Sequence, residues 1–327
     1  MRKRLDPSRE CPLSQATSLR KPRVQATLPA IKDPCVTKIL LHLGAHRTGS
    51  THVQGVLGKN LPLLADAGIG APPQRAVKDA LTKPIGSRIP SVKAGFGRLL
   101  KAEGLADRST VILSDENLLG FLNSIFSHGA FYPDTARRMA RLRKMLPVVP
   151  ARIVIAIRPY ESYFASAYGR WLSPKRMVLP REVLADLVQG LARGWPDVLA
   201  EVADTFPESR LVISEYSPDP RFGPSQLTAL LGPLADQLFY NPGYRWNRSM
   251  SARQTMLYEQ AIKAGEAVKA DDIRTWKRFK QPRLLDGFWD APTAAALSAR
   301  YAADRAIIRE RFPAFVSAKA FEAQDTG

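Results

Sequence analysis

Short apolar runs alternate with amphipathic stretches along most of this chain. Four runs have the length and composition of buried strands, and each is followed by apolar positions at helical spacing. These runs cover residues 39–43, 110–113, 152–157 and 210–214. Apolar strands that alternate with helices are typical of a parallel sheet covered on both faces. The pattern therefore predicts a three-layer α/β fold with a mainly parallel central sheet flanked by helices.

The helical stretches follow these strands in order. Pro62 lies inside the first of them and is expected to kink or split it. Residues 70–108 are interrupted by proline and glycine, which predicts short helices over one edge of the sheet. Longer helices are predicted at 51–67, 133–146, 160–172, 180–191, 195–205, 224–231, 249–265 and 293–311.

Composition and patterning divide the chain into a tail and one domain. Residues 1–35 carry basic residues, proline and serine without a hydrophobic period, which predicts a disordered basic tail before a single α/β domain at 36–320. The tail lacks the apolar segment of a secretion signal, and Cys11 and Cys35 both precede the first strand. A reducing, cytoplasmic location is therefore expected. No apolar run approaches the ~18 residues of a membrane span.

The net charge is the second unusual property. The sequence contains 48 Lys and Arg against 30 Asp and Glu, a formal charge of +18. Such an excess favours a polyanionic partner, for example a nucleic acid, an acidic glycan or a phosphorylated nucleotide. A role in solubility alone explains the charge equally well, so charge does not select the partner.

Residues 44–51 carry the most specific chemical signal. Read as a pattern, Gly44 to Thr51 is G-x-x-x-x-G-S-T, directly after an apolar strand and at the start of a helix. Converging backbone N–H groups and a helix N-terminus make such a turn suitable for phosphate or sulfate. Arg47 supplies a side-chain cation. Ser50 stands where the lysine of an ATP-binding P-loop would be, which argues against a nucleotide kinase.

The other strand ends also carry polar residues. Asp115 and Glu116 follow the second strand, and Arg158 follows the third, with Ser166 two helical turns later. Carboxyl ends of parallel strands meet at one edge of the sheet, where ligands bind. Two anion-binding strand ends predict a ligand with two separated phosphate-like groups, and a carboxylate between them could serve as a general base. The sequence has only four histidines, and its two cysteines both precede the first strand, so no metal is expected.

Each of these residues also has a purely structural interpretation. The two acidic residues could cap the turn that follows them, and Arg158 could pair with a surface carboxylate. His42 lies among apolar neighbours and is expected in the core or at a sheet edge. Four aromatic residues could stack on sugar rings, although a core position is the favoured interpretation: Trp171, Trp195, Tyr244 and Trp246.

Taken in order, these motifs resemble the sulfotransferases that use 3′-phosphoadenosine 5′-phosphosulfate, particularly the bacterial and carbohydrate-type members. Residues 46–51 (HRTGST) are similar to their 5′-phosphosulfate loop, and residues 157–168, in which an arginine and a serine stand eight apart, are similar to their 3′-phosphate motif. Residues 211–216 (LVISEY) and 247–251 (NRSMS) resemble two later segments of the family. The resemblance covers roughly residues 38–265 and implies a P-loop-like sulfotransferase fold.

The resemblance also implies roles for individual residues. The donor's 5′-phosphosulfate would bind the turn. Its 3′-phosphate would bind Arg158 and Ser166, and Arg248 is a weaker candidate for the same group. Glu116 would be the general base, and Asp115 and His46 are the second choices for that role. The turn residues in this assignment are Arg47, Thr48, Gly49, Ser50 and Thr51.

One departure from the family concerns Arg47, since the family usually has lysine there. Arginine binds the same oxygens but is a poor proton donor. The acceptor would be a hydroxyl or amine, with an acidic glycan as one class that the basic charge suits. Two alternatives stay open: a P-loop-like nucleotide kinase, and a non-enzymatic nucleic-acid-binding protein, for which the basic-aromatic cluster at 276–280 is the motif.

Overall fold

The computed structural model describes residues 36–87, 95–175, 177–241, 250–266 and 287–316. All of these belong to one compact unit, Pro34–Gly327. The predictions for the basic tail at 1–35, for Arg248 and for the cluster at 276–280 fall outside the described residues.

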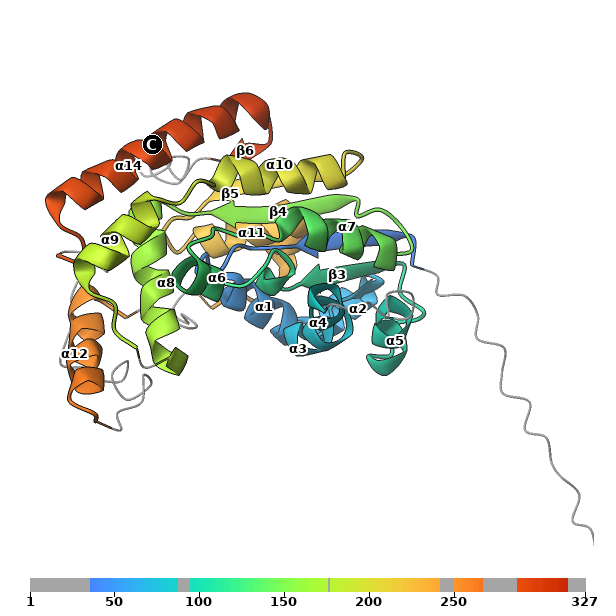
Figure 1. Cartoon of the computed structure of the whole chain (residues 1–327). Helices are drawn as coiled ribbons and strands as arrows, with labels where there is room; N and C mark the ends of the chain where they lie inside the picture. Colours follow the sequence, from blue (N-terminus) through green and yellow to red (C-terminus); the bar gives the residue numbers. More distant parts are fainter. Residues whose placement is uncertain (1–35, 88–94, 176, 242–249, 267–286, 317–327) are drawn as a thin grey trace, which may run out of the picture. The chain divides into compact units, whose positions relative to one another are not determined.

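The centre of the fold is a six-stranded sheet in the order β2-β3-β1-β4-β5-β6, and every strand pair in it is parallel (Figure 1). Its strands carry the apolar runs found in the sequence, and the α/β fold with a parallel central sheet is confirmed. The strands are β1 (Lys38–His42), β2 (Ile69–Gly70), β3 (Thr110–Ser114), β4 (Arg152–Ile157), β5 (Arg210–Glu215) and β6 (Phe315–Val316).

Helices cover both faces of this sheet. Those before β4 are α1 (Ser50–Lys59), α2 (Leu61–Asp66), α3 (Gln74–Val77), η1 (Lys78–Thr82), α4 (Lys83–Gly86), α5 (Gly95–Ala102), η2 (Glu116–Leu118), α6 (Asn123–His128) and α7 (Thr135–Met145). Those after β4 are α8 (Tyr160–Lys175), α9 (Arg181–Gln189), α10 (Trp195–Thr205), α11 (Phe222–Leu231), η3 (Gly232–Gln237), α12 (Ala252–Lys263) and α14 (Ala291–Arg311).

The alternation of side chains along each strand divides the core in two. Ile39 and Leu41 of β1 belong to the larger cluster, which includes residues of α7, α8, α10 and α14. Leu40, between them, faces the opposite side and belongs to a smaller cluster with residues of α1 and α11. Both faces are therefore buried, which explains why the strands read as continuous apolar runs.

The strand order creates a crevice at the end of β1. The helix after β1, α1, packs on one face of the sheet, whereas the helix after the neighbouring β4, α8, packs on the other. Where connections leave adjacent strands on opposite faces, a crevice forms beyond their carboxyl ends, and ligands of such sheets bind there. The chain's G-x-x-x-x-G-S-T turn and Arg158 both lie at this point.

Differences from the predicted elements are confined to short segments. Pro62 does split the first helix, because α1 ends at Lys59 and the proline lies in the first turn of α2. The sequence interpretation missed β2 and β6, each of two residues, and the short helix α6. None of the described helices combines the length and apolar character needed to cross a bilayer.

Candidate functional site

The turn between β1 and α1 is held in an unusual backbone conformation. Gly49 has φ +86° and Gly44 has φ +35°, and a Cβ added to Gly44 would lie only 3.1 Å from the His42 ring and from the Ser50 Cβ. Arg47 also has a positive φ, +65°, which is uncommon for a residue with a side chain. Strain of this kind is held in place by the surrounding structure and clusters at functional sites.

The N-terminus of α1 points into this turn without a side-chain cap. Gly49 occupies the cap position, and the first turn of the helix contains no acidic residue. Its N–H groups and positive dipole end are therefore suited to an anion. Thr48 has a different role from the one predicted for its hydroxyl: it is fully buried and donates to the Ala45 carbonyl at 2.6 Å, which stabilises the turn itself.

Arg47 and Arg158 lie together at the crevice. Arg158 Nη1 donates a hydrogen bond of 2.7 Å to the carbonyl oxygen of Arg47, and Arg47 Nε donates one of 2.8 Å to Ser166 Oγ. Arg158 Nε donates to Ser162 Oγ at 2.9 Å. Ser166, which the sequence interpretation assigned together with Arg158 to the 3′-phosphate, thus contacts Arg47, and Ser162, one turn earlier on α8, contacts Arg158.

The Arg158 guanidinium is buried, and no carboxylate within the described part of the chain lies beside it. The residue is 4% exposed, and its guanidinium carbon lies 4.4 Å from the centre of the Tyr216 ring. Burial lowers the pKa of Arg158, and the phenols of Tyr216 and Tyr163 offset only part of this effect. Among the described residues, no Asp or Glu neutralises the group. Buried charges are normally paired, so this position favours an anionic ligand.

Asp115 and Glu116 serve different purposes despite being adjacent. Asp115 is fully buried and accepts hydrogen bonds from Gln74, Thr82 and Asn117. Its oxygens are therefore occupied in holding the segment after β3, which makes it a poor candidate base. Glu116 is only partly buried and accepts a 3.1 Å bond from Gln54 of α1.

The pKa of Glu116 lies below its ordinary value. Burial raises it, but the nearby imidazoles of His46 and His42, the Glu116 backbone N–H and the Gln54 amide together outweigh burial. Glu116 is consequently ionised at neutral pH, the state required of a base.

His46 belongs to a buried hydrogen-bond chain. Its Nδ1 lies 2.8 Å from the Tyr132 hydroxyl, and its Nε2 lies 3.2 Å from Asn117 Oδ1. The Tyr163 hydroxyl donates to that of Tyr132, so the Tyr132 proton is directed to His46 Nδ1 and the imidazole proton sits on Nε2. Burial lowers the pKa of His46 and keeps it neutral. Both ring nitrogens are engaged, so His46 orients the turn rather than receiving a proton from a ligand.

A second buried histidine, His42, connects the turn to β3. His42 Nδ1 lies 2.8 Å from Ser114 Oγ, and its Nε2 lies 3.4 Å from Gln226 Oε1. Since the Gln226 amide nitrogen donates to the Thr48 carbonyl, its oxygen faces His42, and the imidazole proton must be on Nε2. Ser114 therefore donates to His42. Burial lowers the pKa of His42 to about 4.

The sequence interpretation placed His42 in the core and did not mention Ser114 as a site residue. The signal that could have found the pair is register, because two parallel strands that end together bring their last residues side by side. His42 and Ser114 are such a pair.

Three further residues have structural roles in the fold. Glu215, at the end of β5, accepts hydrogen bonds from Tyr301 and Arg305 of α14 and fastens that helix to the sheet. Trp171 and Trp195 are 1% and 0% exposed, which confirms the core interpretation for both. The described residues contain no group of three or more histidine, cysteine or acidic side chains arranged to hold a metal.

Comparisons with family models, with curated proteins and with solved structures found no match to this chain.

A buried arginine holds the segment that carries Glu116. Arg138 of α7 is 1% exposed and donates to the carbonyls of Leu118 at 3.0 Å, Asn117 at 2.7 Å and Thr82 at 3.4 Å. Burial lowers its pKa to about 10, which still leaves it charged at neutral pH. Arg138 thus fixes the backbone directly after Glu116.

Replacing this arginine should destabilise the fold. Arg138→Met would leave three carbonyls without their donor, and we expect the free energy of unfolding to fall by about 2–4 kcal/mol. Arg137→Met, on the same helix but exposed, should cost less than about 1 kcal/mol. Denaturant unfolding of both variants measures the difference. Equal losses would mean that the three carbonyl contacts do not contribute to stability.

Proposed function

We propose that this protein transfers a sulfuryl group from 3′-phosphoadenosine 5′-phosphosulfate to the hydroxyl group of an acceptor. One observation carries the proposal: the turn that resembles a 5′-phosphosulfate loop and the arginine that resembles a 3′-phosphate ligand are joined by a direct hydrogen bond, from Arg158 Nη1 to the Arg47 carbonyl. These residues are 111 positions apart in sequence, so their contact is independent of the motif patterns themselves.

The charges at this point support a donor with two anionic groups. The uncapped N-terminus of α1 and the Arg47 side chain would bind the 5′-phosphosulfate, with Gly49, Ser50 and Thr51 supplying backbone N–H groups. Arg158 and Ser166 would bind the 3′-phosphate. A guanidinium has five N–H donors, and the two contacts made by Arg158 leave others for that group.

The reaction would proceed by direct displacement at sulfur. The acceptor oxygen forms a bond to sulfur while the bond from sulfur to the bridging phosphate oxygen breaks, and the departing phosphate keeps the electron pair. Arg47 and the N-terminus of α1 stabilise that growing negative charge. Arginine provides this stabilisation without donating its proton.

Glu116 would take the proton of the acceptor hydroxyl. It is ionised at neutral pH, and it is linked through Gln54 to the first turns of α1. These turns lie beside residues 44–51, which we call the anion turn. Asp115 and His46 are less suitable because their polar atoms are already engaged.

The two alternative functions have weaker support. A kinase would need a lysine at the position of Ser50 to contact the β- and γ-phosphates. The basic-aromatic cluster that motivates nucleic-acid binding falls outside the described residues.

Removing Arg158 should impair recognition of the 3′-phosphate selectively. We expect Arg158→Ala to weaken binding of 3′-phosphoadenosine 5′-phosphate by about 10- to 100-fold, the loss of a charge-assisted hydrogen bond, and to weaken adenosine 5′-phosphate much less. Isothermal titration calorimetry measures both ligands. Arg170→Ala, an exposed arginine of the same helix α8, controls for charge. Parallel losses for the two ligands would show that Arg158 does not read the 3′ group.

Neutralising Glu116 should separate catalysis from donor binding. Glu116→Gln keeps the size of the side chain but removes its basicity, so turnover should fall by ~10²-fold or more while the affinity for 3′-phosphoadenosine 5′-phosphate stays within about twofold. Release of that product during steady-state turnover is the readout, with the exposed Glu182→Gln as control. A fully active Glu116→Gln variant would exclude the base assignment.

A further inference from the structure

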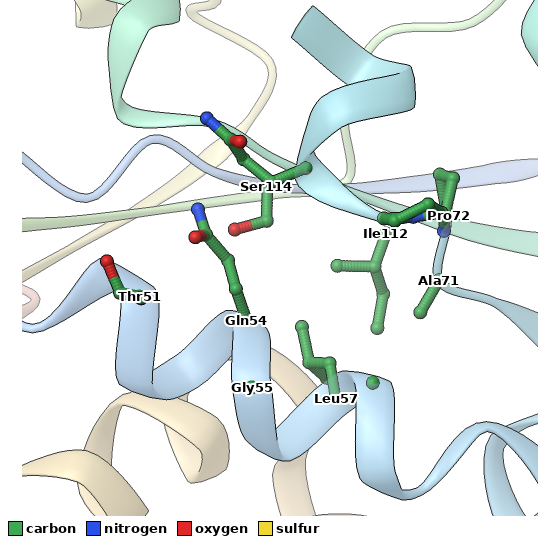
Figure 2. A pocket seen from close by; sticks show the side chains of 11 residues that line it. Thr51, Gln54, Gly55, Leu57, Ala71, Pro72, Ile112 and Ser114 are labelled. Atoms are coloured by element: carbon green, nitrogen blue, oxygen red, sulfur yellow. The ribbon is translucent and has the colours of Figure 1, made fainter. Parts of the chain in front are cut away.

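A pocket of about 250 Å³ lies beside the anion turn, between α1, the segment after β2 and the end of β3 (Figure 2). A cavity of about 150 Å³ is enough to bind benzene, so this pocket has room for a compact organic ligand. Sequence motifs did not indicate this pocket, since it is formed by residues of three separate segments.

The two ends of the pocket differ in chemistry. Thr51, Gln54 and Ser114 lie toward one end, and the side chains of Ala71, Pro72 and Ile112 lie toward the other (Figure 2). None of the eleven lining residues is charged. An acidic glycan would find no cation here, whereas an apolar body with one hydroxyl matches both ends.

The polar end adjoins the predicted reaction centre. Thr51 belongs both to the anion turn and to the pocket wall, and Gln54, one turn further along α1, donates to Glu116. Ser114 uses its proton on His42 Nδ1, so its oxygen presents lone pairs rather than a donor. A ligand that enters hydroxyl-first would meet Gln54, whose amide nitrogen is hydrogen-bonded to the proposed base, Glu116.

We propose that this pocket binds the sulfuryl acceptor and that the acceptor is a compact, uncharged alcohol with a mainly apolar body. The proposal rests on the sulfuryl transfer proposed above. The acceptor hydroxyl lies near Ser114 and Gln54, its oxygen forms the new bond to sulfur, and its proton passes to Glu116. The apolar body fills the space between Leu57, Ala71 and Ile112.

Gly58 offers a way to test the pocket without disturbing the fold. It lines the pocket from α1, and a Cβ added to it meets no atom within 4 Å. Gly97 of α5 is a matched control, because it is also an exposed helical glycine with open space at its Cβ and does not line the pocket. Replacing either glycine raises helix propensity by a similar amount.

The experiment measures binding of 4-fluorobenzyl alcohol by fluorine NMR titration. Gly58→Leu should weaken binding at least fivefold, and Gly97→Leu should leave it within twofold. Ala71→Val, which adds methyl groups on the opposite wall, provides a second test and should also weaken binding. The proposal would be overturned if the alcohol did not bind the natural protein, or if all variants bound it with equal affinity. It would also be overturned if glucuronic acid bound more tightly than the alcohol and lost affinity in Gly58→Leu.

A separate titration with 3′-phosphoadenosine 5′-phosphate distinguishes failure of the pocket from failure of the proposed function. Donor product that binds while 4-fluorobenzyl alcohol does not would contradict the acceptor pocket alone. If the alcohol bound in a Gly58-dependent way but 3′-phosphoadenosine 5′-phosphate did not bind, sulfuryl transfer would be contradicted. The acceptor role of the pocket would then be contradicted as well.

Discussion

The site depends on a buried positive charge, that of Arg158, which has no carboxylate partner among the residues that the structure describes. Arg158 emerges from the end of β4 into a position that is 4% exposed, where its contacts are a backbone carbonyl, a serine hydroxyl and an aromatic face. Removing a guanidinium from water is costly, and these neutral partners compensate only in part. An anionic ligand bound at this position would complete the compensation.

The same arginine couples the two halves of the sheet. Its hydrogen bond to the Arg47 carbonyl links the strand end that leads to α8 with the turn that leads to α1, on opposite faces of the sheet. Arg47 in turn reaches back to Ser166 of α8. Each arginine therefore positions the other at the end of β1.

Much of the fold was predictable because its strands are buried on both faces. Continuous apolar runs fixed the positions of β1, β3, β4 and β5, and parallel pairing brought their polar ends together. The two-residue strands β2 and β6 were not predictable, since such short segments have no period. The turn at residues 44–51 was singled out from spacing alone, but the hydrogen bonds from Arg47 to Ser166 and from Arg158 to Ser162 were not predictable from it.

Side-chain direction explains the remaining differences at the site. The sequence does not distinguish Asp115 from Glu116, since both are acidic residues at the end of the same strand. In the structure Asp115 is buried and accepts hydrogen bonds from the side chains of three residues, whereas Glu116 is hydrogen-bonded to Gln54 of α1. The pocket beyond Glu116 was likewise invisible in the sequence, because its walls come from α1, the segment after β2 and β3. Its lining residues are uncharged, although the chain as a whole is strongly basic.

Calorimetric titration of the natural protein with three ligands, each at two salt concentrations, tests the central claim most directly. The account predicts that 3′-phosphoadenosine 5′-phosphate binds more tightly than ATP and than a random oligonucleotide, and keeps this preference at the higher salt concentration. Tightest binding of ATP, or binding of the oligonucleotide alone with a steep salt dependence, would contradict a site built for an adenylate with separate 3′ and 5′ anionic groups.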